Sequence, residues 1–231
     1  VALGGGTPKV VHTKESDGFR MSPEAFRAAI NPRTKAVVIN SPSNPTGAAY
    51  TEKELVKIAE IALENGLLII SDEIYERLSY DGFKVTSIAS LSEEAKKSTV
   101  VLNGVSKTYS MTGWRIGYAA GPKNSIKAMT NIQSQSTSNP TSISQWAAVE
   151  AITGPQDAAA AMRQSFLERR DFIVSLLNEV PGVTCQVPGG AFYVWPNITE
   201  ACRRIGAADS EDFRKRLLHE AGVAVLADIH F

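Results

Sequence analysis

The sequence predicts an α/β fold with a mostly parallel central sheet and flanking helices. Near-continuous apolar runs at residues 35–40, 67–71 and 100–102 have the length and composition of strands that are buried on both faces. An amphipathic helix pattern over residues 51–65 separates the first two runs. A strand, a helix and a second strand in this order form a βαβ unit, in which the two strands run parallel.

Two helices are expected in the first 65 residues. Ser22 followed by Pro23 has the form of an N-cap with proline at the first helical position, and this helix should end before Asn31-Pro32. In the helix over residues 51–65 the apolar positions repeat at helical spacing. One face of that helix should therefore pack against the sheet.

The rest of the chain has further strand and helix patterns, without internal repeats or low-complexity segments. A strand is expected at residues 116–120 and a polar loop at residues 133–141. We expect helices at residues 124–132, 142–152, 156–178 and 210–221, and three more strands at residues 183–187, 191–195 and 223–226.

Composition is that of an ordinary globular protein, with 43% hydrophobic and 21% charged residues in a chain of 231. The 24 basic and 24 acidic residues give a formal net charge of zero. This balance excludes roles driven by bulk charge, so we expect no nucleic-acid partner and no membrane partner. Cys185 and Cys202 form no metal or redox motif, and we expect a reducing, cytoplasmic location.

Chemically informative side chains follow each of the three expected central strands. The carboxyl ends of parallel strands meet at one edge of an open α/β sheet, where ligands bind. We therefore expect these side chains to contribute to one site. The candidates are Asn44 after the first strand, Asp72 and Tyr75 after the second, and Ser106, Lys107 and Arg115 after the third.

The pair formed by Lys107 and Arg115 indicates the kind of ligand. An amine held among apolar neighbours can lose its proton and attack a carbonyl, whereas a guanidinium stays charged and suits a phosphate. A ligand with an aldehyde and a phosphate is therefore indicated, and pyridoxal 5′-phosphate (PLP) is such a ligand. A solvated surface position explains most isolated lysines, but this lysine lies between two expected buried strands.

The segment SKTYSMTGWRIG, residues 106–117, closely resembles the lysine motif of the class I aminotransferases, the aspartate-aminotransferase-like enzymes of PLP fold type I. Within that segment and one residue beyond it, MTGWRIGY (residues 111–118) resembles the sequence that follows the lysine in the bacterial and plastid branch of the family, which includes aspartate/prephenate enzymes. The resemblance implies the fold type I architecture, with a partial α+β small domain. It also implies transfer of an amino group between an L-amino acid of aspartate or glutamate type and a 2-oxo acid.

The resemblance further implies a role for each catalytic candidate. Lys107 would form a Schiff base with PLP and carry the substrate's α-proton, as nucleophile and general acid–base. Asp72 would hold the proton on the ring nitrogen. Tyr75 and Asn44 would hydrogen-bond the ring oxygen, and the bond from Asn44 to Pro45 would be cis. Taken singly, Asp72 and the NPTG segment are ordinary turn residues, but their order along the chain favours the functional interpretation.

Two positions depart from the family's pattern. Gly104 lies three residues before the lysine, where a serine often binds the phosphate, and Ser106 stays open as a substitute. Ser134 lies where animal-type aspartate aminotransferases carry an arginine for the substrate's distal carboxylate. Any dicarboxylate specificity must therefore come from elsewhere.

Compared with the family, the chain resembles a piece that lacks both ends. We expect a large PLP-binding domain over residues 1–155 without its N-terminal part. We also expect a bridging helix and small C-terminal domain over residues 156–231 without its C-terminal part. The piece alone is expected to be inactive, and the full-length protein is expected to be a homodimer.

Two other functions are compatible with the same motifs. A PLP-dependent lyase or synthase would use the same fold and cofactor residues, because the substrate pocket and not the fold determines the reaction. An aminotransferase-like effector domain of a transcriptional regulator would be joined to a DNA-binding domain. Neither such a domain nor a basic patch is visible in this sequence.

Overall fold

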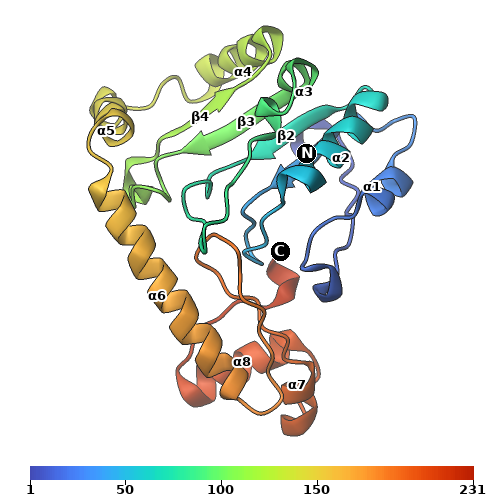
Figure 1. The fold of residues 1–231 in the computed structure, drawn as a ribbon, viewed down its shortest axis with the longest axis vertical. Helices are drawn as coiled ribbons and strands as arrows, with labels where there is room; N and C mark the ends of the chain where they lie inside the picture. Colours follow the sequence, from blue (N-terminus) through green and yellow to red (C-terminus); the bar gives the residue numbers. More distant parts are fainter.

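A four-stranded sheet in the order β1-β2-β3-β4 forms the centre of the fold (Figure 1). In the computed structural model, which describes residues 1–231, the first three strands run parallel and the fourth runs antiparallel to the third. Asn40 lies opposite Asp72 and Asp72 opposite Leu102, so the carboxyl ends of the parallel strands meet at one edge. The predicted α/β fold is confirmed. The strands are β1 (Ala36–Asn40), β2 (Leu68–Asp72), β3 (Thr99–Gly104) and β4 (Gly117–Ala120).

Helix α2 (Glu52–Glu64) connects β1 to β2 and packs on the sheet. It begins with a capping box, in which Thr51 accepts from the N–H of Glu54 and the Glu54 carboxylate accepts from the N–H of Thr51 at 2.8 Å. Its apolar face joins Ile39 and Ile69 of the strands in a cluster of 11 buried residues. Burial of this face contributes more to the stability of a helix of this length than helix propensity does.

Two shorter helices, α1 (Pro23–Ala29) and α3 (Glu93–Ser98), pack beside α2. The Ser22 hydroxyl caps α1 by accepting from the N–H of Ala25 at 3.1 Å, which confirms the helix start expected from the sequence. Helix α3 was not expected. Its buried residue is Ala95 alone, so hydrophobic periodicity gives no signal over so short a helix.

The three helices that follow β4 match the expected ones, with one correction. Helix α4 extends four residues into the segment expected to be a polar loop. The hydroxyls of Ser134 and Ser136 donate to carbonyl oxygens within the same helix, so polar residues continue the helix here. The helices are α4 (Lys123–Ser136), α5 (Ser142–Thr153) and α6 (Asp157–Glu179).

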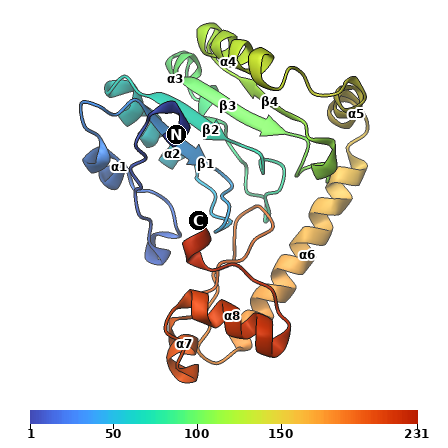
Figure 2. The same cartoon turned by 180° about the vertical axis from the view of Figure 1, so that it is seen from behind.

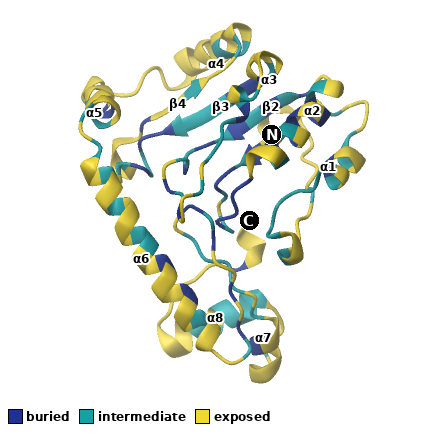
Figure 3. Ribbon diagram, in the orientation of Figure 1, coloured by how far each residue is buried: buried dark blue, intermediate teal, exposed yellow.

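Burial differs between the two groups of helices (Figure 3). Helix α2 buries five of its residues, whereas α4 buries none and the long α6 buries only Arg170 and Val174. Most of the surface of α4, α5 and α6 is therefore exposed to solvent. No helix of this chain combines the length and the apolar character that crossing a membrane requires.

After α6, residues 180–231 form two α-helices at the far end of α6 (Figures 1 and 2), a short 3-10 helix at residues 228–230 and irregular segments. The prediction of strands at residues 183–187, 191–195 and 223–226 is wrong. A strand needs a neighbouring strand for its backbone hydrogen bonds, and here only isolated bridges form, between Thr184 and Asn197 and between Ser79 and Gly190. The helices are α7 (Thr199–Ile205) and α8 (Ser210–Ala221).

Candidate active site

The loops that follow the parallel strands meet at the carboxyl edge of the sheet. Asn40, the last residue of β1, joins two of them. Its side-chain N–H donates to the carbonyl oxygen of Asp72 at 3.1 Å, and its side-chain oxygen accepts from the N–H of Asn44 at 2.7 Å. The loop with Lys107 follows β3, which pairs with β2 at this edge. The structure therefore brings the candidates from all three loops to one region.

The loop after β1 contains two cis peptide bonds, Ser41-Pro42 and Asn44-Pro45. The second confirms the cis bond that the family resemblance implies. Ser41 is buried and its hydroxyl accepts from the N–H of Tyr50 at 3.1 Å, whereas Asn44 is exposed. The loop thus has a fixed base and an accessible side-chain amide.

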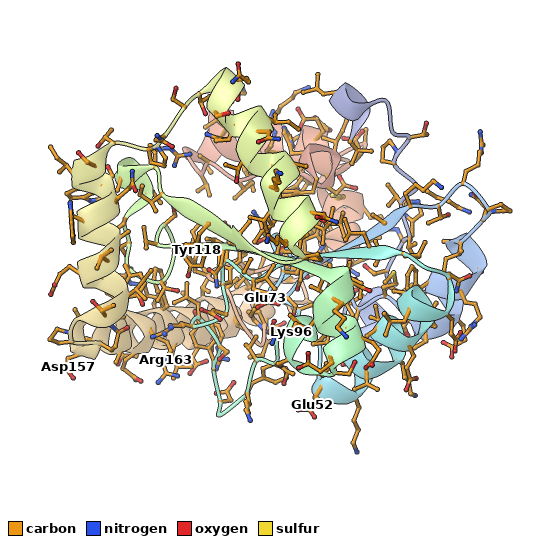
Figure 4. The ribbon with its side chains drawn as sticks, turned by 90° about the horizontal axis from the view of Figure 1, so that it is seen from above. Glu52, Glu73, Lys96, Tyr118, Asp157 and Arg163 are labelled. Carbon is orange, nitrogen blue, oxygen red and sulfur yellow. The ribbon has the colours of Figure 1, made fainter.

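Two adjacent carboxylates at the end of β2 differ in their surroundings. Asp72 is half-buried and accepts from the N–H of Ile74 at 3.2 Å. Glu73 lies in the interior (Figure 4), where one of its oxygens accepts from the hydroxyls of Ser71 and Ser87 at 2.8 and 2.7 Å. Burial raises the pKa of Glu73, and the two hydroxyls oppose this rise. Asp72 is therefore the carboxylate that a ligand at the edge can reach.

The amine of Lys107 lies beside two aromatic rings. Its Nζ is 5.8 Å from the ring centroid of Tyr75 and 5.5 Å from that of Phe192. Val105 and Thr108, on either side in the same loop, are buried and anchor it. The anchored loop and the two rings restrict the positions that the Lys107 amine can reach. This restriction favours productive contact between the amine and a bound molecule.

Tyr75 is 3% exposed, and its hydroxyl lies 2.7 Å from the hydroxyl of Tyr193. Burial raises the pKa of Tyr75, and the contact with Tyr193 and the negative charge of Asp72 raise it further, whereas a hydrogen bond with the Asn44 side chain lowers it. The phenol therefore keeps its proton at neutral pH and serves as a hydrogen-bond donor.

Three aromatic residues that the sequence motifs do not identify complete this region. Phe192 packs edge-on against Tyr75, with 5.5 Å between ring centroids, and stacks with Phe166 of α6 at 5.2 Å. Tyr193 lies 4.7 Å from Phe192. The sequence signal that could have identified this segment is the pair Gly189-Gly190 before Ala-Phe-Tyr, because glycines permit a close approach of backbone segments.

The aromatic segment, residues 188–193, is held by the loops after β1 and β2. The N–H of Gly190 donates to the carbonyl oxygen of Gly47 at 3.0 Å, and that of Ala191 donates to Leu78 at 2.8 Å. Gly47 has φ +69°, and a Cβ there would lie 2.4 Å from the Cβ of Pro188, so only glycine fits at this position. These contacts with loops explain why the strand expected at residues 191–195 is not formed.

A buried arginine of α6 holds the aromatic segment from a second direction. The Arg170 guanidinium contacts both carboxylate oxygens of Asp81 at 2.6 and 3.1 Å and pairs with Asp171 at 2.6 Å. It also donates to the carbonyl oxygen of Pro188 at 3.2 Å and lies 4.9 Å from the ring centroid of Tyr80. The arginine lowers the pKa of Asp81. Helix α6, the loop after β2 and the aromatic segment are thus joined at one point.

The candidates for phosphate binding lie near the start of β4 and beside the lysine. Arg115 is exposed and donates to the carbonyl oxygen of Thr112 at 2.9 Å, which leaves other N–H groups of its guanidinium for an anion. Ser106 is half-buried. A Cβ at Gly104 would lie 2.8 Å from the carbonyl oxygen of Ile116, so a serine at this position would require β3 and β4 to shift.

This fold and this set of side chains are those of a known class of protein. The sequence model of the aminotransferase class I and II family matches residues 1–230, and the chain belongs to that family. Aspartate aminotransferases use PLP, and the groups at the sheet edge fit it. They offer an amine for its aldehyde, a carboxylate for its ring nitrogen, a phenol and an amide for its ring oxygen, and a guanidinium for its phosphate.

Particular relatives narrow the comparison. An aspartate aminotransferase from Geobacillus stearothermophilus is 54% identical over 226 residues, and an aspartate/prephenate aminotransferase from Cereibacter sphaeroides is 51% identical over 232 residues. Each match covers 98% of this chain and 58% of the relative, so the chain spans less than two thirds of these proteins.

Solved structures give the same result. The aspartate aminotransferase from Rhizobium meliloti has a TM-score of 0.91 at 43% identity, over 96% of this chain and 57% of that structure. The aromatic aminotransferase from Pyrococcus horikoshii has a TM-score of 0.91 at 39% identity, over 97% of this chain and 59% of that structure. The fold described above is therefore shared with solved members of the family.

Proposed function

We propose that the protein is a PLP-dependent aminotransferase that moves an amino group between an L-amino acid of aspartate or glutamate type and a 2-oxo acid. The observation that carries this proposal is the meeting of the Lys107 amine, the buried Tyr75 phenol and the Asp72 carboxylate at one edge of the sheet. The names of the relatives, aspartate and aspartate/prephenate aminotransferases, support the substrate class. When bound, PLP supplies an aldehyde for amines and a protonated pyridine ring that accepts the electron pair freed at the substrate's Cα.

Lys107 would hold the aldehyde end of the cofactor and act as the general acid–base. Its Nζ would take the proton from the substrate's Cα and return it to the carbon on the other side of the substrate's nitrogen, because one flexible side chain reaches both positions. The rings of Tyr75 and Phe192 limit the range of this amine. Because the amine moves less before the reaction, less conformational entropy is lost when it meets the reacting atom.

Asp72 would hold the proton on the ring nitrogen through a charge-assisted hydrogen bond. One of its carboxylate oxygens is fixed by the N–H of Ile74, which leaves the other for the ring nitrogen. Tyr75 and Asn44 would donate to the ring oxygen, and the raised pKa of Tyr75 keeps its donor proton in place. We assign catalysis to Lys107, Asp72 and Tyr75, and cofactor binding to these three and to Asn44, Ser106 and Arg115.

We further propose that the whole protein is a cytoplasmic homodimer, as is typical of the family. The unpaired Cys185 and Cys202 support a reducing compartment. Residues 1–155 would belong to the large cofactor-binding domain, and residues 156–231 to a bridging helix with a small domain. The course of α6, which leads away from the sheet to α7 and α8, supports this division (Figure 1).

A half-reaction tests the function. The whole protein, loaded with PLP, is mixed with L-glutamate or L-aspartate in the absence of a 2-oxo acid. We expect one equivalent of 2-oxoglutarate or oxaloacetate for each cofactor and conversion of the cofactor to its pyridoxamine form, followed by absorbance. Release of ammonia or pyruvate without the pyridoxamine form would contradict the proposal and identify a lyase.

A further inference from the structure

The side-chain amide of Gln156, between α5 and α6, makes four hydrogen bonds. Its oxygen accepts from the Arg77 guanidinium at 2.9 Å and from the Tyr109 hydroxyl at 3.1 Å. Its nitrogen donates to the carbonyl oxygens of Ala151 and Gly154 at 3.0 and 2.8 Å. An amide has two lone pairs and two N–H bonds, so the hydrogen-bonding capacity of this side chain is fully used.

The partners determine which way this amide points. A guanidinium only donates and a backbone carbonyl only accepts, whereas a phenol can do either. Rotating the amide of Gln156 by half a turn would therefore break three of its four bonds. A fully satisfied amide with one permitted orientation holds its partners at fixed positions.

The two donors belong to the two loops that carry the candidate catalytic residues. Tyr109 follows Lys107 by two residues, and Arg77 follows Tyr75 by two residues. Both loops are tight turns, in which the carbonyl oxygens of Lys107 and Tyr75 accept backbone hydrogen bonds from three residues further on. A displacement of either donor is therefore transmitted to the catalytic side chain of the same turn.

The first turns of α6 touch the same region at two further places. The Ser110 hydroxyl donates to the sulfur of Met162 at 3.2 Å, and Phe166 stacks on Phe192, which lies beside the Lys107 amine. Asp157 and Arg163, labelled in Figure 4, mark these turns of the helix. Gln156 is thus the polar end of a contact surface that begins where α6 begins.

We propose that Gln156 is a positioning residue for the pair formed by Lys107 and Tyr75, an inference that rests on the proposed aminotransferase function and deepens it. By holding both loops to one oxygen atom, it sets the 5.8 Å separation between the Lys107 amine and the Tyr75 ring. Loss of this atom leaves both catalytic groups present but lets them move relative to one another. Turnover then falls, because a displacement of about 1 Å can cost about a hundredfold in rate.

The test compares three variants of the whole, PLP-loaded protein with the wild type. Gln156→Leu removes all four bonds at similar side-chain volume. Tyr109→Phe removes only the bond to the lysine loop. Gln164→Leu is the matched control, because Gln164 is exposed on the same helix and bonds only to Glu168. The measurements are kcat, KM and the pH midpoint of the cofactor's visible absorbance.

We expect Gln156→Leu to lower kcat about tenfold to a hundredfold, with KM changed by less than about threefold. A hydrogen bond donated to the cofactor's ring oxygen stabilises the form with one proton fewer, so a displaced Tyr75 should raise the absorbance midpoint by about half a pH unit. Tyr109→Phe should cause smaller changes in the same directions. Gln164→Leu should cause none.

Wild-type kcat and midpoint in Gln156→Leu would overturn the inference, and so would equal changes in Gln164→Leu. If Gln156→Leu does not fold, Tyr109→Phe decides, and an unchanged midpoint there overturns the inference. A wild type that binds PLP but produces no 2-oxo acid would refute the proposed function. The midpoint comparison would then still test the role of Gln156.

Discussion

The two sides of the candidate active site are built in different ways. On the sheet side, Asp72, Tyr75 and Lys107 lie at or within a few residues of strand ends, and the register of parallel strands places them. On the opposite side, the aromatic segment has no regular pairing and is held by loop carbonyls and by Arg170. The sheet side carries the amine of Lys107 and the carboxylate of Asp72, whereas the aromatic segment carries the rings of Phe192 and Tyr193. The strand register therefore positions the reactive groups, whereas a segment without regular secondary structure packs against them.

The largest effect is expected from the amine on the sheet side. Lys107→Ala should lower turnover by about 10⁴-fold or more, because it removes both the attachment point of the cofactor and the general acid–base. Borohydride should no longer trap PLP on the protein, as measured by mass spectrometry. Lys127→Ala, at an exposed position of α4, should change neither result. Turnover above about one per cent of wild type in Lys107→Ala would place the amine function elsewhere.

The next effect concerns the carboxylate at the end of β2. Asp72→Asn keeps the shape but removes the negative charge, and turnover should fall about a thousandfold, corresponding to about 4 kcal/mol in the barrier. Borohydride should still trap the cofactor. Glu73→Gln is the matched control, because the neighbouring carboxylate faces Ser71 and Ser87 in the interior. A comparable loss in Glu73→Gln would show that the two carboxylates are not functionally distinct.

On the opposite side, Arg170→Met should affect stability and, less strongly, turnover. The free energy of unfolding should fall by about 1–3 kcal/mol, because the buried hydrogen bond to Pro188 and the contact with Tyr80 are lost. The pair with Asp81 adds only about 0–1 kcal/mol, since that carboxylate is 63% exposed. Turnover should fall about tenfold as the aromatic segment loosens. Arg163→Met, at an exposed position of α6, should change neither quantity.

The same variant has a predicted dependence on pH. Arg170 lowers the pKa of Asp81 in the folded state, so this pair stabilises the fold above the ordinary pKa of aspartate, about 3.9. That contribution is lost as the pH falls through the lower, folded value. The stability difference between wild type and Arg170→Met should therefore narrow below about pH 4 in denaturant titrations. A difference that widens there would exclude Asp81 as a partner that matters for stability.

The smallest effect is expected from Tyr193→Phe, which keeps the ring and removes one hydroxyl. Turnover should fall by about twofold to tenfold, the range for one neutral hydrogen bond. The pKa of Tyr75 should move toward its usual value but stay above it, because burial is the larger cause. The Cζ resonance of labelled tyrosine would report this change. A loss as large as that of Asp72→Asn would show that the aromatic segment takes part in the chemistry, and the distinction between the two sides would fail.

The sheet side could be predicted from the sequence because its signals are local. Apolar runs mark β1, β2 and β3 to within one or two residues, and the α2 pattern requires only residues of that helix. The polar residues that follow these strands stand out against apolar neighbours. The Asn44-Pro45 cis bond could be predicted only through the family resemblance of its short motif.

The aromatic segment could not be predicted, because residues far away in the chain determine its backbone. Residues 191–195 are a short apolar and aromatic run like that of a strand, but the N–H of Ala191 donates to the carbonyl oxygen of Leu78 and that of Gly190 to the carbonyl oxygen of Gly47. Local periodicity contains no information on such partners. Gln156 was missed for a related reason, since glutamine is common on helices and only its four bonds distinguish it.

The close packing at Gly104 has a consequence for evolution. A Cβ there would lie 2.8 Å from the carbonyl oxygen of Ile116 and 3.1 Å from the Cα of Gly117, so a mutation to serine would first require β3 and β4 to move apart. That movement would displace the start of β4, and Arg115 with it. Any anion binding gained from a serine at position 104 would then be offset by weaker anion binding at Arg115. Selection for a firmer hold on an anion is therefore expected to act at positions other than 104, such as the half-buried Ser106 beside Lys107.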